Sequence, residues 1–322
     1  MKKIKQNYIL ILTIIIIAVL TLLAVYNNIK EYKMNVFSYK YHINQCNNEY
    51  KNDSSMQEYC NNLKLWGGPK RSDAFFTFFD LLFDDRLMIL ELLLPLLIIL
   101  CSLDKFLKKL KSGYLKNELT RMPYKKIIIK EWLNGAKIIF IIPCFFIVLF
   151  IISFFMTGNI NYKESLNNFD PWVNPLFFNN LFTSIIIYFL NFFLYGVFLV
   201  NIGFIVARDS KNIILTYITS YLVYFGLWLL SETILGYFIF NGLLGKPEWH
   251  NYFSFTSIWG YPNINNFYVR TLIQLLWTLG SFLVLIKFYK KKEGMKRMSK
   301  KILVTGCNGF YLQINLYYLF CY

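Results

Sequence analysis

The residues of this chain that could carry out chemistry are few and scattered. It has only two histidines, His42 and His250, and no Cys/His cluster with metal-site spacing. No GxxxxGK[ST] phosphate-binding loop occurs, because GLLGKP at 242–247 has the wrong spacing. No Ser/His/Asp set can be argued either. The sequence therefore predicts no catalytic residue, no metal site and no cofactor site on this chain.

Two cysteines, Cys46 and Cys60, lie in one polar segment after the first apolar run. If that segment faces the outside of a cell, the two thiols can form a disulfide, because disulfides persist there. Two free thiols are the alternative, and the sequence leaves both open.

Four polar residues fall inside long apolar stretches: Glu91, Asn191, Asn201 and Gln274. A carboxylate at membrane depth is costly unless it faces protein or water, so Glu91 either lines a pathway or reaches the headgroup region. Asparagine and glutamine side chains hydrogen-bond across helix contacts in membranes. We therefore predict a packing role for these amides, with contact to a transported substrate as the alternative.

The elements that must position these residues are apolar helices. Of the 322 residues, 56% are hydrophobic and 20% are aromatic. Crossing a hydrocarbon core of about 30 Å takes about 20 mostly apolar residues in a helix. The sequence predicts an all-α integral membrane protein with six spans, at about 8–25, 87–103, 138–155, 181–207, 213–230 and 271–286.

The segments between the spans differ in character. A polar outer loop is predicted at 27–86, and a cytosolic segment at 104–137. The stretch 231–268 is apolar but interrupted by glycine and proline, which predicts a re-entrant outer hairpin. Residues 1–292 form the predicted six-span domain, and 293–322 form an appended cytosolic tail of no assigned role.

Charge predicts the orientation. With the N-terminus inside, the inner segments hold 23 of the 34 Lys and Arg residues and the outer segments hold 11. The positive-inside rule then places both termini in the cytosol. The formal net charge of +16 could favour nucleic acid, but these lysines cluster at the ends of apolar runs. That placement favours anionic membrane lipid, so no nucleic-acid partner is predicted.

The segment 104–137 carries ten Lys/Arg residues against three acids. One apolar stripe at helical spacing leads into it: Leu103, Phe106, Leu107 and Leu110. After Gly113, a second stripe follows: Leu115, Leu119 and Met122. Pro123 should end this second helix. A basic segment with two small apolar faces favours a membrane surface or a soluble partner that binds beneath it.

With this layout, the chain resembles the membrane (permease) subunit of type 2 ATP-binding-cassette transporters. The resemblance covers about residues 1–292, as a layout of spans plus one motif. In SGYLKNELTRMPYKKIIIKEW, the family's Gly-x-x-Lys…Arg…Lys pattern is matched by Gly113, Lys116, Arg121 and Lys130. Lys109 stands where the family often has an acidic residue.

The resemblance implies a coupling helix that binds a separate ABC ATPase, which would bind the ATP. A second permease copy or a paralogue would complete the pathway. The site residues it implies are Gly113, Leu115, Lys116, Leu119, Arg121 and Lys130. Export of an amphiphilic or hydrophobic substrate (a peptide, drug, lipid or glycan) across a bacterial cytoplasmic membrane is the expected function. The alternative is a membrane scaffold, sensor or immunity protein whose outer loop binds a ligand.

Overall fold

The computed structural model describes residues 8–50, 55–69, 73–82, 84–160, 181–208, 212–255 and 266–300. For residues 116–117, 119–120, 181 and 290–300 it describes the backbone alone. The longer helices are α1 (Tyr8–Asn48), α4 (Asp85–Lys111), α6 (Tyr124–Ala136), α7 (Ile141–Thr157), α10 (Leu181–Ala207), α11 (Ile213–Leu229) and α13 (Phe267–Lys300). The shorter ones are α2 (Gln57–Trp66), α3 (Ala74–Leu82), α5 (Tyr114–Arg121) and α12 (His250–Phe253).

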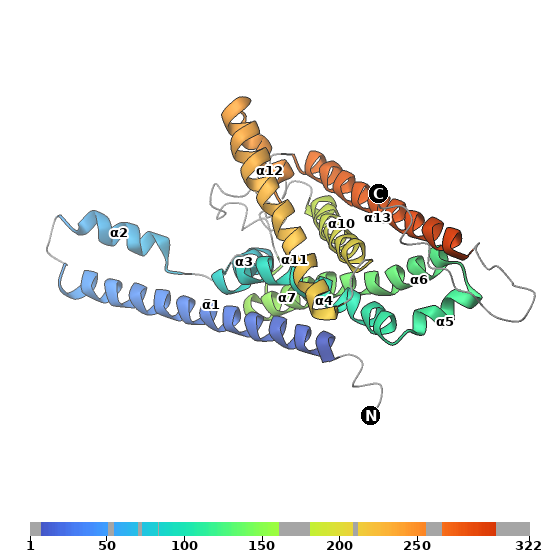
Figure 1. The fold of residues 1–322 in the computed structure, drawn as a ribbon. Helices are drawn as coiled ribbons and strands as arrows, with labels where there is room; N and C mark the ends of the chain where they lie inside the picture. The colour runs from blue at the N-terminus through green and yellow to red at the C-terminus, as the bar shows by residue number, and fades with distance from the viewer. Residues whose placement is uncertain are drawn as a thin grey trace, which may run out of the picture.

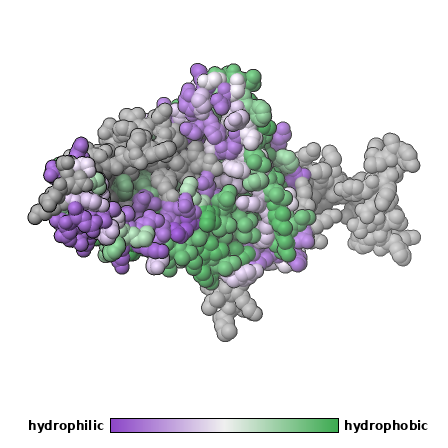
Figure 2. Space-filling view, turned by 90° about the vertical axis from the view of Figure 1, so that its left-hand side faces the viewer, coloured by the Kyte–Doolittle hydropathy of each residue, from purple (hydrophilic) through white to green (hydrophobic). Residues whose placement is uncertain are grey.

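All regular elements within the described ranges are helical, which confirms the prediction of an all-α protein (Figure 1). Six helices in these ranges are long and apolar enough to cross a membrane. They occur where the six spans were predicted, so the structure indicates a multi-pass membrane protein. Figure 2 shows hydrophobic side chains gathered in continuous patches beside hydrophilic ones.

The first helix is much longer than predicted. It does not end at Val25 but continues through the polar segment to Asn48. No glycine or proline interrupts it, and polar side chains one turn apart bond to each other: Asn27 Nδ2 donates to Glu31 Oε1 at 2.7 Å, and Asn48 Nδ2 to Asn44 Oδ1 at 2.9 Å. The first part of the segment predicted as an outer loop is therefore helical, as a continuation of the first span. The helix extends beyond the bundle, with α2 beside its far end (Figure 1).

The end of the predicted outer loop is also helical and buried. Helix α3 begins after Asp73, whose Oδ1 accepts from the backbone N–H groups of Phe75 and Phe76 at 2.7 and 3.0 Å, a typical N-cap. Phe78 and Phe79 are buried, and Phe78 meets Phe146 of α7 edge to face. Residues 73–82 therefore belong to the bundle.

Helix α10 is the central element, and it packs against α13, α4 and α11. Two of its glycines permit close packing. A Cβ on Gly196 would lie 2.6 Å from Ile139 Cγ2, and one on Gly203 would lie 3.1 Å from Leu103 Cδ1. Ile139 therefore lies closer to the α10 backbone than a Cβ at position 196 would permit, whereas Leu103 would have to shift only slightly to admit a Cβ at position 203.

Three other spans differ in their bounds. The third is one helical run from Tyr124 to Thr157, with a 3₁₀ turn, η2 (Lys137–Phe140), between α6 and α7. Pro143 contributes to that tighter turn, because it has no N–H to bond to Ile139. The sixth span continues as α13 to Lys300 with no break at 292, and the rest of the tail, 301–322, lies outside the described residues.

The fifth span continues past Leu230 as a π-helix, η3 (Leu230–Leu243). The chain then reverses at Gly245 (φ +59°) and passes through the 3₁₀ turn η4 (Pro247–Trp249) into α12. Helix α12 packs back on η3 and on α13, so the chain reverses direction within the segment predicted as a re-entrant hairpin. Its further residues 256–265 lie outside the described ranges.

Four of the spans alternate in direction: α1, α4, the run formed by α6 and α7, and α13. The Lys108 ammonium lies 4.8 Å from the Tyr8 ring centroid, and the Tyr124 and Tyr289 rings lie 5.8 Å apart. The start of α1, the end of α4 and the start of α6 therefore lie together with residue 289 of α13 at one end of the bundle. Helix α5 lies at the same end, opposite α2 (Figure 1).

Candidate functional site

The basic segment forms a helix–turn–helix link between two apolar helices. Helix α4 ends at Lys111, Gly113 turns the chain with φ +72°, and α5 follows from Tyr114 to Arg121. The next residues are extended, and α6 begins after Pro123. The prediction of a short second helix that Pro123 ends is therefore confirmed.

The first apolar stripe faces the core of the bundle, so it is not the surface for a membrane or a soluble partner that the sequence favoured. Leu103, Phe106 and Leu107 are buried, and the Phe106 ring stacks on Phe204 of α10. Leu110, at the end of the stripe, is 38% exposed. This stripe fixes the last turns of α4 to the bundle.

The second stripe corrects one prediction. Leu115 is only 6% exposed and belongs to the core, so it holds α5 against the bundle and presents no surface to a partner. Met122 also packs against the core. The side chains of Leu119 and Lys116 lie outside the described residues, although their backbone belongs to α5. Of the described α5 side chains, Tyr114 and Arg121 are exposed, so a partner can reach them.

Four charged side chains connect the three helices. Lys109 Nζ of α4 lies 2.5 Å from Glu131 Oε1 of α6. Glu118 of α5 lies between two lysines, with its Oε1 4.0 Å from Lys109 Nζ and 3.8 Å from Lys130 Nζ. The Glu131 side chain is 2% exposed, so its charge depends on Lys109. We call these four residues the charge cluster.

The charge cluster gives roles to the motif residues. Gly113 supplies the left-handed turn that starts α5, and Lys130 pairs with Glu118. Arg121 is exposed at the end of α5, together with nearby Lys111, Lys125 and Lys126. The outer surface of the segment is therefore basic, while the acids Glu118 and Glu131 face inward. Sequence reasoning missed the pairing, although Lys109, Lys130 and Glu131 were all visible as charges beside apolar stripes.

The buried asparagines act in helix packing. Asn201 accepts from Trp132 Nε1 of α6 at 2.8 Å and donates to Ser281 Oγ of α13 at 2.9 Å. Asn191 donates to Thr271 Oγ1 of α13 at 2.7 Å. The structure thus places both amides between helices, as the packing prediction requires.

Gln274 belongs to a second polar group near the other end of the bundle. Its Oε1 accepts from Arg270 at 3.1 Å, and Arg270, which is 0% exposed, also donates to the carbonyl of Ser254 at 2.9 Å. Ser254 donates to Glu232, which lies 2.6 Å from His250 Nε2. These contacts hold α12 between η3 and α13. The sequence did not predict this group, because it joins positions on three separate elements.

Glu91 lies within electrostatic range of Glu232 and is half-buried on α4. The structure therefore places it against protein rather than fully toward the membrane surroundings. A Cβ on Gly236 of η3 would lie 2.1 Å from His250 Cδ2, so the His250–Glu232 contact needs a glycine there.

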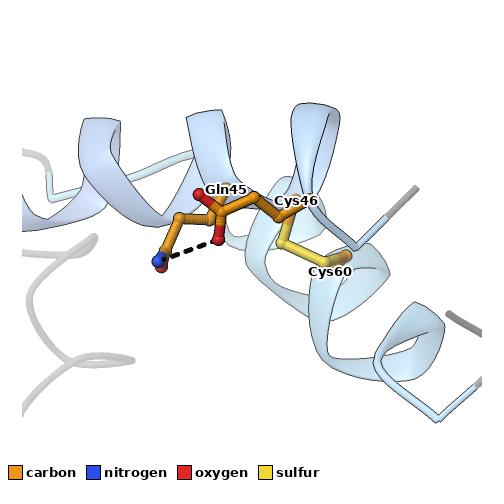
Figure 3. The surroundings of a disulfide bond; sticks show 4 residues. Gln45, Cys46 and Cys60 are labelled. Atoms are coloured by element: carbon orange, nitrogen blue, oxygen red, sulfur yellow. Dashed lines mark hydrogen bonds between the residues drawn. A yellow bond between two sulfur atoms is a disulfide. The ribbon is translucent and has the colours of Figure 1, made fainter. Parts of the chain in front are cut away.

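Cys46 and Cys60 form a disulfide, which decides between the two alternatives (Figure 3). It joins the end of α1 to α2 across 14 positions of sequence. The Tyr39 and Trp66 rings add an edge-to-face contact at 5.6 Å between the same two helices. We call residues 27–50 and 55–66 of this pair the outer arm, because they extend beyond the bundle (Figure 1).

The described residues contain no group of three or more His, Cys, Asp or Glu side chains that could hold a metal ion. No family model matches the chain, and no curated protein or solved structure matches it.

Proposed function

We propose that the chain is the permease subunit of a type 2 ATP-binding-cassette transporter, with both termini and α5 in the cytosol. In this proposal a separate ABC ATPase binds the basic surface of α5 and supplies the energy. A second permease copy or paralogue completes the pathway. The transported substrate is amphiphilic or hydrophobic, and the direction is export.

The observation that carries the proposal is the way α5 is attached. It is short, and its own residues Leu115 and Glu118 fix it to the core and to the ends of two apolar helices, α4 and α6. A displacement of α5 must therefore move both helix ends, because the buried core and the charge cluster join them. Such a connection allows movement of a bound ATPase to reach two spans together, as rigid-body coupling between proteins requires.

Co-purification tests the proposal directly. We expect an ABC ATPase to be encoded beside this chain's gene. The chain is expressed with that ATPase, and each is recovered through a tag on the other. We expect a stable complex that Tyr114→Ala with Arg121→Glu weakens at least tenfold. The matched control is Leu65→Ala, an exposed apolar residue on the outer arm. Failure to form a complex, or a complex weakened only by the control, contradicts the proposal.

The outer arm favours a second candidate, a membrane sensor or scaffold. A disulfide-braced helix pair that extends beyond the bundle is suited to ligand binding. Under this alternative, deletion of α2 abolishes ligand binding to intact cells. The unaltered chain does not stimulate any ATPase.

A further inference from the structure

A groove lies between α1 and α7, with α4 and α6 as its floor. Its volume is about 1010 Å³. Apolar side chains form both walls: Ile14, Ala18 and Leu22 on α1, and Phe145, Val148 and Ile152 on α7. Helix α1 packs on α4, and α7 packs on α3 and η2, but α1 and α7 are not packed against each other. The groove between α1 and α7 is therefore open to the surroundings of the bundle.

The length of the groove matches a lipid chain. From Ile9 to Leu22, its α1 wall spans about 20 Å at 1.5 Å per residue. The hydrocarbon part of one membrane leaflet is about 15 Å thick, half of the full core. A groove of this length can hold one acyl chain from end to end.

One end of the groove is polar and carries uncompensated positive charge. The two carboxylates that line it are already paired: Asp104 with Lys108 at 2.7 Å, and Glu131 with Lys109 at 2.5 Å. Lys105 and Lys137 also line this end, and neither forms an ion pair with a described residue. The charges of the two ion pairs cancel, so the positive charges of Lys105 and Lys137 remain available to bind an anion.

We propose that this groove binds an anionic phospholipid of the surrounding membrane. Its phosphate is held by Lys105 and Lys137, and an acyl chain lies between α1 and α7. A second copy of the chain fits less well, because the site is a hollow with charge at one end only. A zwitterionic lipid would leave the lysine charge uncompensated. This inference goes beyond the proposed function and does not rest on it, since no ATPase is involved.

The experiment uses the full chain in nanodiscs of phosphatidylcholine. A small fraction of the lipid is phosphatidylglycerol with a photoreactive diazirine on its acyl chain, and a parallel sample has the same diazirine on phosphatidylcholine. After illumination, labelled peptides are mapped by mass spectrometry. We expect phosphatidylglycerol to label residues 9–22 and 141–152 at least fivefold more than phosphatidylcholine does.

Variants test the two lysines. Lys105→Gln and Lys137→Gln should each lower phosphatidylglycerol labelling about fivefold, as removal of one lysine near a lipid surface predicts. The matched control is Lys125→Gln, which removes an exposed charge at the same end of the bundle, outside the groove, and should leave labelling unchanged.

Three results would overturn the proposal. One is equal labelling of the unaltered chain by the phosphatidylglycerol and phosphatidylcholine probes. This comparison does not depend on the folding of any variant. Another is labelling that Lys105→Gln with Lys137→Gln does not reduce. The third is a disulfide between cysteines introduced on α1 of one copy and α7 of another, formed in place of lipid labelling, which would make the groove a dimer contact.

Discussion

Lys109 Nζ lies 2.5 Å from Glu131 Oε1, so the last turns of α4 are joined to the middle of α6. The lysine side chain is 30% exposed, whereas the glutamate side chain is 2% exposed. The pair is therefore asymmetric. Removal of the partner costs more free energy when it leaves the buried carboxylate unpaired than when it leaves the lysine unpaired. This asymmetry makes the charge cluster testable by single substitutions.

Lys109→Met should destabilise the protein more than Glu131→Gln does. Loss of Lys109 leaves a buried carboxylate without its partner, which should cost about 2 kcal/mol after allowance for the partial exposure of the pair. Lys109→Met with Glu131→Leu should recover part of that loss. Thermal unfolding of the purified chain measures each variant.

The control for that series is Lys111→Met. Lys111 is exposed at the end of α4 and forms no ion pair with a described residue. Loss of such a surface charge should change the free energy of unfolding by about 0.5 kcal/mol or less. Equal destabilisation by Lys111→Met and Lys109→Met would show that the charge cluster has no special role.

Gly113→Ala should destabilise the turn between α4 and α5 by about 1 kcal/mol, because φ +72° is costly for a residue with a Cβ. No atom lies within 4 Å of the position that the Cβ would take, so the backbone alone accounts for the effect. Gly113→Asn should cost less, since asparagine tolerates this conformation better. ATPase stimulation in the complex should fall in the same order. An alanine variant as stable as the unaltered chain would contradict the observed turn.

Gly236→Ala should break the His250–Glu232 contact. The added methyl group would overlap the imidazole ring, which must then leave Glu232 and loosen α12. We expect a loss of about 1–3 kcal/mol, typical of overpacking, seen as a lower melting temperature. Gly226→Ala, on α11 with nothing within 4 Å of its Cβ, is the matched control and should not destabilise. If both variants behave alike, the close approach of His250 is not a packing constraint.

Cys46→Ser with Cys60→Ser should loosen the outer arm and leave the bundle intact. The disulfide closes a loop of 14 positions, for which chain entropy predicts about 3 kcal/mol. That stabilisation acts locally, because Cys46 and Cys60 both lie in the arm. Limited proteolysis should therefore cut within 49–66 much faster, with no change in the melting temperature of the spans. A large drop in that temperature would mean that the arm supports the bundle.

The sequence predicted the six spans because long apolar runs have few alternatives in a membrane. It did not predict the length of α1, since apolar content marks where a helix leaves the membrane and says little about where the helix ends. The absence of glycine and proline from 8 to 48 was the available signal. Within α5, the stripe at Leu115 was found correctly, but periodicity cannot tell a core face from a docking face.

The charge cluster and the Arg270 group could not be predicted for another reason. Each joins side chains from helices far apart in sequence, such as Lys109 with Glu131 or Arg270 with Ser254, and that proximity depends on tertiary packing. The role of Asn201 was predicted in kind, because an amide in an apolar helix needs a partner. Which partners it has, Trp132 and Ser281, only the fold decides.

Photo-cross-linking in living cells tests the central claim, that α5 binds an ABC ATPase in the cytosol. A photoreactive amino acid replaces Tyr114, which is 52% exposed on α5, or Leu65, which is 84% exposed on the outer arm. The proposal predicts a light-dependent product with the ATPase from position 114 and none from position 65. No product from position 114 in cells that contain both proteins, or a product from position 65, would contradict it.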